Sequence, residues 1–573
     1  MHEDLQNKKS FYTILACIVF AILIGRFAQL QLYSWDKYFR TSERNRIREV
    51  VIQPSRGLIY DRNGEILVDN RPGYSVSVVP YELLNADSSI VLLSSIIRQK
   101  PSQIRNKIKK KQVGLFYPVK LKRQVGFKVL SALEEHRLEL PGVLYGVESK
   151  RFYPAGVRAP HLFGYLGEVT SKELSARNDE DYRAGDLIGK NGIELQYEHY
   201  LRGEPGVQYI EVDVLGREVR DLPELSPKFP VPGKNLYLTL DAEIQRYLEK
   251  VMEDKKGAAV VLDPRNGEVL AIVSEPDYDP EIFSSPLAPA IWNQLVNHEN
   301  KPLYNRACQS LYPPGSTFKL VLAAAGLETG IIDPERKVLC KGSYRLGRRS
   351  FDCWKKEGHG QVNLMQAIEQ SCNVYFYTMS LEVGLDNWSK FAKLFQFGKP
   401  TRLDLPNESS GLVPTKEYFN ERYRKQGWTR GMILNLAVGQ GDLLVTPLQM
   451  AYFTMILANE GFAFKPHLLK KIEDPTSRQT VPIEVDSLKV RGVGPETFKK
   501  IKLGMSLVVN GPHGTGRAAW IPQMTVCGKT GTAQNPHGED HAWFIGFAPM
   551  ENPVVALCIL VENGGSGGAV AAP

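Results

Sequence analysis

A serine and a lysine three residues apart are the first residues in this sequence that could carry out chemistry. Ser316 follows Pro313-Pro314-Gly315, and Lys319 precedes an apolar run that reaches Gly326. Chain breakers followed by helix formers predict a helix with Ser316 in its first turn, and residues three apart on a helix face the same way. Lys319 could therefore take the proton of the Ser316 hydroxyl, provided that burial or nearby positive charge lowers the pKa of its amine. Ser-x-x-Lys is common by chance, so further residues must support this interpretation.

Two later groups of polar residues could complete such a site. Ser371 and Asn373 follow a helical run from Val362 to Glu369 and offer a hydroxyl and an amide. The string Lys529-Thr530-Gly531-Thr532 lies between two apolar segments, which predicts the edge of a strand. That edge would carry a cation and two hydroxyls, and Gly531 would let a substrate backbone come close.

Ser-x-x-Lys, Ser-x-Asn and Lys-Thr-Gly in this order are the signature of serine acyl-transferases of the penicillin-binding and β-lactamase type. Over nearly its whole length the chain resembles a class B penicillin-binding protein of the elongation type. Further strings carry that resemblance: Arg56-Gly57-Leu58-Ile59-Tyr60-Asp61, Arg151-Phe152-Tyr153-Pro154, Gly189-Lys190-Asn191-Gly192-Ile193-Glu194 and Gly439-Gln440-Gly441 with Thr446-Pro447-Leu448-Gln449-Met450. The resemblance implies an α+β fold, in which a transpeptidase domain (an antiparallel sheet with helices on both faces) stands on an elongated α/β pedestal.

The resemblance also implies the reaction, D,D-transpeptidation of peptidoglycan stem peptides during cell-wall elongation, with β-lactams as inhibitors. Ser316 would be the nucleophile and Lys319 its base, although the identity of the acylation base in this superfamily is disputed. Ser371 would relay a proton to the leaving group, Asn373 would hold the substrate amide, and Lys529 would shape the field around Ser371. Thr530 and Thr532, beside Gly531, would bind the terminal carboxylate. The backbone N–H groups of Ser316 and Thr532 would form the oxyanion hole.

Outside these motifs, the 573-residue chain contains one segment that could be a membrane anchor and two larger regions. Arg26 is the only charge between Phe11 and Tyr33, and about 20 apolar residues span a bilayer, so we expect an uncleaved transmembrane anchor at 11–33. Residues 1–10 would be a cytoplasmic tail, and the bulk of the chain would lie outside the bacterial cytoplasmic (inner) membrane. We expect the pedestal at 34–232, with a head insertion around 82–142 in which Ile104 and Ile108 share a helix face.

The string Pro230-Val231-Pro232-Gly233 is typical of a linker, which places the transpeptidase domain at 233–573. Strands are predicted at 257–262, 268–273, 524–527, 541–548 and 553–561. Relatives usually carry a terminal helix over one face of this sheet, whereas this sequence stops at Pro573.

Four potential metal ligands, Cys340, Cys353, His359 and Cys372, lie within one short stretch. Three thiolates and one imidazole could close a tetrahedral structural zinc site, and some members of the elongation branch bind zinc here. The alternative is a disulfide between Cys340 and Cys353, with Cys372 a buried thiol. Catalysis itself requires no cofactor. His161, by contrast, is interpreted as a structural histidine rather than a ligand.

Composition and family resemblance also limit which partners are expected. The net charge of +8 is spread along the chain, which gives no support to nucleic-acid binding. No glycosyltransferase module fits between anchor and linker, so the resemblance implies a membrane glycosyltransferase partner of the shape, elongation, division and sporulation family. Other elongation-complex proteins would contact the pedestal. The alternatives are a D,D-carboxypeptidase or β-lactamase, a division-type transpeptidase, and a non-enzymatic β-lactam sensor or scaffold.

Overall fold

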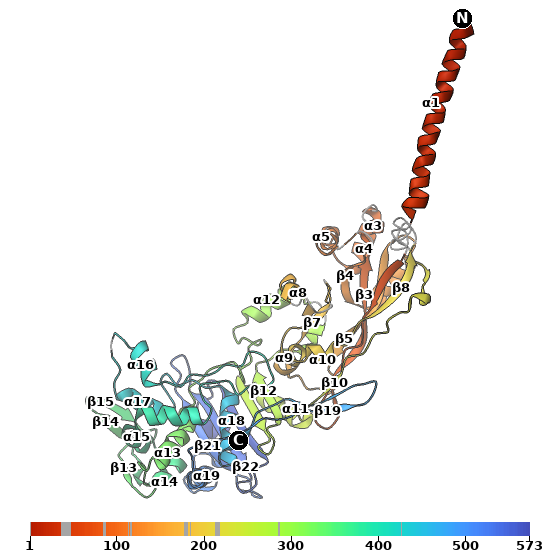
Figure 1. Cartoon of the computed structure of the whole chain (residues 1–573). Coiled ribbons are helices and arrows are strands. Elements are labelled where there is room, and N and C mark those ends of the chain that lie inside the picture. The colour runs from red at the N-terminus through yellow and green to blue at the C-terminus, as the bar shows by residue number, and fades with distance from the viewer. Residues whose placement is uncertain are drawn as a thin grey trace. The chain divides into compact units, whose positions relative to one another are not determined.

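The structure, a computed structural model, describes residues 2–35, 47–83, 87–112, 114, 117–176, 182–183, 185–212, 218–284, 287–425 and 427–573 (Figure 1). Residues 84–86, 113 and 115–116 of the predicted head insertion therefore lie outside the described residues. The chain forms two compact units, and each is described by itself. The first comprises Met1–Ser55, Tyr74–Glu148 and Gly203–Pro232, and the second comprises Arg56–Gly73, Ser149–Arg202 and Gly233–Pro573.

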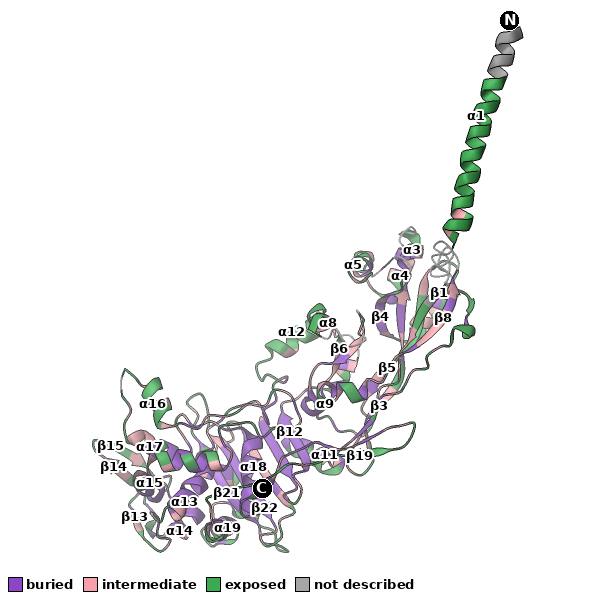
Figure 2. Ribbon diagram, viewed as in Figure 1, coloured by how far each residue is buried: buried purple, intermediate pink, exposed green. Residues whose placement is uncertain are grey.

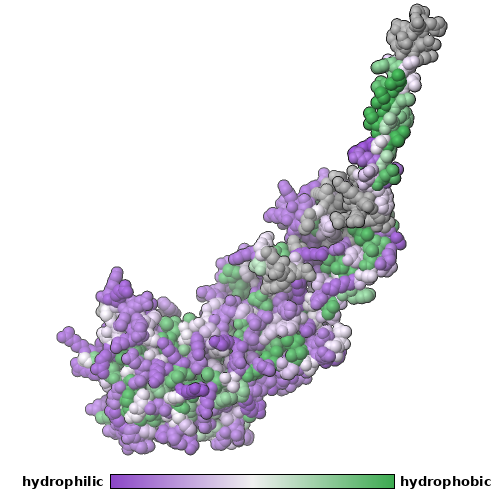
Figure 3. All heavy atoms as spheres, viewed as in Figure 1, coloured by the Kyte–Doolittle hydropathy of each residue, from purple (hydrophilic) through white to green (hydrophobic). Residues whose placement is uncertain are grey.

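The N-terminal segment is one long apolar helix. Helix α1 (His2–Ala28) continues into the π-helical turn η1 (Gln29–Tyr33). Within it, Ser10–Tyr33 is long and apolar enough to cross a membrane, and none of this span is buried against the rest of the chain. Its exposed aliphatic surface is visible in Figure 3. Arg26, its one charged residue, donates a hydrogen bond to Gln29 at 2.6 Å. The anchor predicted at 11–33 falls on this helix.

The first unit contains a small antiparallel sheet and a separate helical layer. Strands β1 (Ile47–Ile52), β8 (Gly206–Val212) and β9 (Glu218–Asp221) pair in that order. Residues 74–78 of β3 (Ile66–Val78) pair with β4 (Val119–Val125). Helices α4 (Asp87–Ile97), α5 (Pro101–Lys111) and α6 (Phe127–Glu135) pack on β4, and the predicted face of Ile104 and Ile108 is buried in their core.

Three of the sequence strings that carry the family resemblance, those containing Arg56, Arg151 and Glu194, meet at a buried ion network in the second unit. The Glu194 carboxylate accepts hydrogen bonds from Arg56 Nε at 2.7 Å and from Arg151 Nε at 2.8 Å. Arg56 also pairs with Glu198 at 2.5 Å. Buried charges persist where they are paired in this way, so these three separate strings fold onto one another. The surrounding short elements are α7 (Pro160–Phe163), β6 (Leu166–Glu168), α8 (Ser171–Ala176), β7 (Leu187–Gly189), α9 (Gly192–Gln196) and α10 (Glu198–Leu201).

A five-stranded antiparallel sheet forms the centre of the second unit, in the order β12–β11–β23–β22–β21. The strands are β11 (Gly257–Leu262), β12 (Val269–Glu275), β21 (Cys527–Ala533), β22 (His541–Ala548) and β23 (Val555–Val561). The strand predicted at 524–527 begins only at Cys527 and runs through Lys529 to Ala533. Met524 instead makes an isolated bridge to Ile521, so the preceding residues form a turn.

Helices cover both faces of this sheet, as predicted. On one face, buried residues of α13 (Lys319–Glu328), α15 (Asn373–Leu394) and α18 (Pro447–Ala458) share a core with alternate residues of β11 and β23 (Figure 2). On the other face, α11 (Ala242–Met252) covers β11 and β12, while residues 567–572 cover β21 and β22. Between them, Val555, Leu557 and Ile559 of β23 are only half-buried.

The helix starts in this unit follow ordinary capping chemistry. The Asp241 side chain accepts the N–H groups of Glu243 and Ile244 at the start of α11. Thr446 and Gln449 form a capping box around Pro447, so α18 begins through a proline in its first turn, as predicted. The remaining elements include α12 (Pro289–Asn297), α14 (Leu364–Glu369), α16 (Lys416–Arg422), α17 (Gly431–Ala437), α19 (Pro495–Asn510) and the hairpin β14 (Ser343–Leu346) with β15 (Arg349–Asp352).

The other strands are short. β2 (Ile59–Tyr60), β10 (Asn235–Leu238), β18 (Leu469–Glu473) and β19 (Thr480–Pro482) lie in one sheet with the first half of β3. β13 (Val338–Cys340) pairs with β16 (Gly360–Val362), and β17 (Phe462–Phe464) pairs with β20 (Ser487–Lys489). β5 (Val143–Phe152) pairs with β3.

Candidate active site

Ser316 lies on a tight turn that is packed against the edge strand β21. The turn η4 (Gly315–Phe318) leads directly into α13, so Ser316 and Lys319 lie three residues apart at the start of a helix, as predicted. Gly315 has a φ of +59° and donates its N–H to the Gly439 carbonyl at 2.9 Å. A Cβ at Gly315 would lie 2.9 Å from the Thr532 carbonyl oxygen, so only glycine allows this approach. Ser316 is thereby held, half-buried, beside β21.

Lys319 is fully buried and points at the Ser-x-Asn loop. Its Nζ donates to the Ser371 carbonyl at 2.8 Å, to the Ser371 hydroxyl at 3.2 Å and to Asn373 Oδ1 at 2.6 Å. Burial lowers the pKa of Lys319 to about 8, because the buried ammonium has lost its water. An amine with a pKa near the working pH is able to exchange a proton with a neighbouring hydroxyl.

Ser371 links two lysines that are distant in sequence. It occupies the short connection between α14 and α15 with a φ of +53°, a left-handed conformation that costs a serine on the order of 1 kcal/mol. Its Oγ accepts hydrogen bonds from Lys529 at 2.9 Å and from Lys319 at 3.2 Å. The strained backbone therefore places a hydroxyl between two buried amines, an arrangement suited to proton relay.

Lys529 reaches Ser371 from the middle of β21. It is fully buried, and its Nζ also donates to its neighbour's carbonyl, that of Thr530, at 3.0 Å. Burial, followed by the charge of Lys319, holds the pKa of Lys529 well below that of an ordinary lysine. Two amines so close cannot both be protonated without cost, so one positive charge shared through Ser371 is the favoured state.

The rest of the Lys-Thr-Gly-Thr string lies along the outer edge of the sheet. β21 pairs with β22 on one side only, and the Thr532 side chain is exposed while Thr530 is buried. The sequence predicts that Gly531 admits a substrate backbone. The structure gives a second reason why this position is a glycine. A Cβ there would lie 2.9 Å from the Pro314 carbonyl oxygen and 3.0 Å from Trp543 Cβ.

Asn373 begins α15 with both ends of its amide engaged. Its Oδ1 accepts from Lys319, and its Nδ2 donates to the Asp352 carbonyl at 3.2 Å, which ties the end of β15 to the site. Hydrogen bonds thus link Lys319, Ser371, Asn373 and Lys529, while Ser316 lies on the turn that leads into Lys319. Thr530 and Thr532 lie on the same strand as Lys529.

One neighbouring residue was missed by the sequence analysis. The Thr515 hydroxyl lies 2.7 Å from that of Thr530. The only local signal is a hydroxyl between two glycines in Gly514-Thr515-Gly516, which marks a tight turn but does not indicate its partner.

The four potential metal ligands converge behind this loop. One ligand atom from each of Cys340, Cys353, His359 and Cys372 lies within 4.8 Å of the others. His359 Nδ1 is 3.5 Å from the sulfurs of both Cys340 and Cys353. All seven cysteines are free thiols, so the alternative disulfide is not present. Three soft sulfurs and one imidazole nitrogen form the donor set that zinc prefers, and their spacing suits a tetrahedral site.

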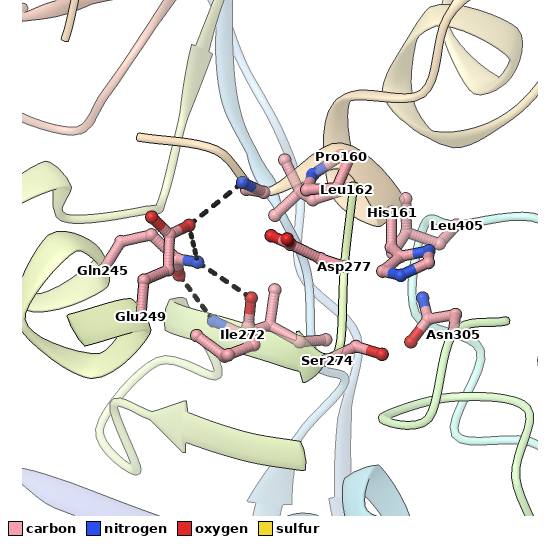
Figure 4. A pocket seen from close by; sticks show the side chains of 12 residues that line it. Pro160, His161, Leu162, Gln245, Glu249, Ile272, Ser274, Asp277, Asn305 and Leu405 are labelled. Atoms are coloured by element: carbon pink, nitrogen blue, oxygen red, sulfur yellow. Dashed lines mark hydrogen bonds between the residues drawn. The ribbon is translucent and has the colours of Figure 1, made fainter. Parts of the chain in front are cut away.

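His161 lines a small cavity elsewhere in the second unit, together with Asn305, Ser274 and Asp277 (Figure 4). Burial, aided by the nearby charge of Arg306, lowers the pKa of His161 to about 4 and keeps the ring neutral at neutral pH. The cavity contains none of the predicted catalytic residues, and among the described residues His161 belongs to no cluster of metal ligands.

Comparison with known protein families gives two matches that together cover most of the chain. The penicillin binding protein transpeptidase domain matches residues 257–573, and the penicillin-binding protein dimerisation domain matches residues 51–238. The first match contains all the residues assembled around Ser316.

Individual relatives match over nearly the full length. The peptidoglycan D,D-transpeptidase MrdA of Acinetobacter baumannii is 34% identical over 596 residues, which cover 99% of this chain and 87% of that protein. The penicillin-binding protein PBP2 of Helicobacter pylori, solved in complex with MreC, superposes with a TM-score of 0.80 at 30% identity and covers 91% of this chain and 98% of its own. A chain from a peptidoglycan synthase complex, studied for its coordination of polymerization and crosslinking, gives a TM-score of 0.71 at 30% identity. The match covers 98% of this chain and 96% of that chain.

Proposed function

The chain belongs to the class B penicillin-binding proteins of the elongation type, and from this premise we propose how its residues carry out crosslinking. It is a serine-type peptidoglycan D,D-transpeptidase. The observation that carries the assignment of residues is the Ser371 hydroxyl held between Lys319 and Lys529, next to the turn that bears Ser316. The site needs no cofactor for acyl transfer, because nucleophile, base and relay are all side chains.

The first half of the reaction forms an acyl-enzyme. Ser316 Oγ attacks the carbonyl of the penultimate D-Ala, and Lys319, with its pKa lowered by burial, takes the hydroxyl proton. The oxyanion that develops is bound by the backbone N–H groups of Ser316 and Thr532, a contribution of roughly 10²–10³ in rate per donor in comparable sites. The proton then passes through Ser371 to the nitrogen of the terminal D-Ala as the peptide bond breaks.

Substrate binding uses the groups around this centre. Thr530 and Thr532 bind the terminal carboxylate along the edge of β21, where Gly531 keeps the strand clear of side chains. The Asn373 amide holds the substrate backbone, and Lys529, which donates a hydrogen bond to the Ser371 hydroxyl, shapes the electrostatic field around it. In the second half an acceptor amine from a neighbouring stem peptide attacks the ester, gives up its proton through the same relay, and releases Ser316.

A crosslinking assay distinguishes this function from the carboxypeptidase alternative. A stem pentapeptide ending in D-Ala-D-Ala is supplied with a labelled amine acceptor, and free D-Ala and joined product are both measured. We expect joined product from the parent and none from Ser316→Ala. Release of D-Ala without joined product would assign the chain to hydrolysis.

We also propose that the cysteine cluster is a structural zinc site. Cys340, Cys353, His359 and Cys372 would hold the ion, and Cys372 lies between Ser371 and Asn373, so the ion would brace the catalytic loop from behind. Metal analysis and free-thiol counting on the purified protein test this. About one zinc per chain would support the site, and one disulfide without metal would refute it.

The larger assembly follows from family membership and the anchor helix. We propose residues 34–232 as the pedestal and 233–573 as the transpeptidase domain, with α1 as a single-pass anchor in the bacterial cytoplasmic membrane and the catalytic unit outside the cytoplasm. A glycosyltransferase of the shape, elongation, division and sporulation family would supply the glycan polymer. Other elongation-complex proteins would bind the pedestal. The H. pylori relative is solved in complex with one partner, MreC.

A further inference from the structure

Beside the proposed carboxylate site, a second threonine hydroxyl lies in contact with Thr530. Thr515, in the turn after α19, approaches Thr530 from outside the sheet with an Oγ1–Oγ1 distance of 2.7 Å. Thr515 is half-buried, and only 6% of Thr530 is exposed. The pair is therefore a defined contact next to the catalytic cleft and not a surface coincidence.

The turn that carries Thr515 is fixed on several sides. A Cβ at Gly514 would lie 2.2 Å from the Val508 carbonyl oxygen, and Gly516 donates its N–H to that same oxygen at 2.9 Å. The buried Glu369, two residues before Ser371, accepts the His513 N–H through its carboxylate at 3.0 Å. Thr515 is thus tied to the loop that carries Ser371 as well as to β21.

The direction of the hydrogen bond between the two threonines follows from counting protons. A hydroxyl has one proton, and a carboxylate can only accept. If Thr530 binds the substrate carboxylate, its hydroxyl must donate its one proton to that carboxylate. The Thr530 oxygen can then only accept a hydrogen bond from a neighbour. Thr515 is the hydroxyl in position to donate to it.

We propose that Thr515 is a positioning residue for recognition of the acyl donor's terminal carboxylate. Its hydroxyl donates to Thr530 and turns the Thr530 proton toward the cleft before substrate arrives. Linked hydroxyls polarise one another, so the Thr530 hydrogen bond to the negatively charged carboxylate is strengthened as well as oriented. This inference rests on the proposed role of Thr530.

A carboxylate and a carboxamide respond differently to this arrangement. The carboxamide is neutral and can donate its own N–H to Thr530, so it does not depend on the direction of the Thr530 proton. Loss of the Thr515 hydroxyl should therefore weaken recognition of a carboxylate selectively. A threonine that merely held the turn in place would affect both groups equally when removed.

The test compares benzylpenicillin with its carboxamide as acylating agents of the full-length protein. Intact-protein mass spectrometry gives the second-order rate constant for each. We expect Thr515→Val, which is nearly isosteric, to slow acylation by benzylpenicillin by up to about tenfold, the upper range for one lost hydrogen bond between neutral groups. Acylation by the carboxamide should change less than about twofold, and Thr515→Ser should restore the parent rates.

Two controls accompany the test. Thr329→Val removes the hydroxyl of an exposed residue, which donates to the Ala325 carbonyl at 2.7 Å at the end of α13, and it should alter neither rate. Thr515→Ala, with a smaller side chain, should give the same selective loss as Thr515→Val. Equal slowing with both agents, or no slowing with either, would overturn the proposal. Failure of the proposed function is a separate result, because the parent itself would then not be acylated at Ser316.

Discussion

At the scale of single residues, the site depends on two amines that cannot both keep their charge. Lys319 and Lys529 are fully buried and share the Ser371 hydroxyl. Burial disfavours the ammonium form of each, and their mutual repulsion adds to it. A neutral amine is therefore available at a pH where an exposed lysine would be protonated, and a base for Ser316 needs this property.

The first prediction concerns pH. With a Lys319 pKa of about 8, only about a tenth of the protein has this amine neutral at pH 7. Because the base must be neutral to accept a proton, acylation by benzylpenicillin should rise roughly tenfold per pH unit below 8 and level off above it. Stopped-flow acylation between pH 6 and 9.5 measures this profile.

The matched control assigns the titration to one lysine. Lys529→Arg fixes a permanent positive charge at the same place on β21, so its repulsion of the Lys319 ammonium should move the midpoint below 8. Lys319→Ala should lose at least about 10² in rate. A profile that is flat, or that falls as pH rises, would contradict the role of Lys319.

The sequence predicted which residues form the site, but not all of their geometry or contacts. The three motifs identified Ser316, Lys319, Ser371, Asn373 and Lys529, because each belongs to a short local pattern. The left-handed φ of Ser371 and the contact between Thr515 and Thr530 follow from tertiary packing. No local pattern encodes them, so the sequence alone could not predict them.

At the scale of elements, the close approach of the η4 turn to β21 sets the geometry of the cleft. Gly315 faces the Thr532 carbonyl, and Gly439 faces Gly315 in turn, so three backbone segments meet without side chains between them. The oxyanion hole proposed from Ser316 and Thr532 requires this contact. Displacement of either segment by a fraction of an ångström would separate its two donors.

The second prediction compares two glycines with similar backbone angles. Gly315 (φ +59°) and Gly330 (φ +68°) both adopt the left-handed conformation, but a Cβ at Gly330 would meet nothing within 4 Å. Gly330→Ala should lower the free energy of unfolding by about 1 kcal/mol through backbone strain, and Gly315→Ala should lower it further, because its methyl group also clashes with the Thr532 carbonyl. Only Gly315→Ala should also slow benzylpenicillin acylation, by at least about tenfold, because the new methyl group displaces Thr532.

Urea unfolding and acylation rates on both variants give the comparison. Equal acylation by Gly315→Ala and the parent would show that the contact between η4 and β21 does not set the oxyanion geometry. At this scale the sequence predicted the strands and helices of the sheet closely. It misplaced the start of β21, because residues 524–526 resemble a strand in sequence although they only follow the tight turn at 521–524.

At the scale of the whole molecule, the apolar N-terminal helix and the proposed catalytic residues lie in different parts of the chain. The apolar helix belongs to one compact unit, and every residue proposed for catalysis belongs to the other. The second unit also contains 56–73 and 149–202, so parts of the predicted pedestal fold with the catalytic segment. A boundary read along the sequence could not show this, because long-range pairs such as Arg56 with Glu194 join strings far apart.

The third prediction separates the two roles. A variant without residues 2–35 should no longer sediment with membranes, because the 24-residue apolar span is lost. Its acylation by benzylpenicillin should stay within about twofold of the parent, since the catalytic unit has its own core. Membrane flotation and acylation rates report the two properties separately. Retention of the shortened variant on membranes would contradict the assignment of Ser10–Tyr33 as the anchor.

The central claim is that the fold delivers an activated hydroxyl at position 316, and covalent trapping measures this most directly. The parent and Ser316→Ala are treated with a fluorescent penicillin, digested, and the labelled peptide is identified by mass spectrometry. We expect one adduct per parent chain, on the peptide that contains Ser316, and none on Ser316→Ala. Equal labelling of the variant, or an adduct on any other residue of the parent, would contradict it.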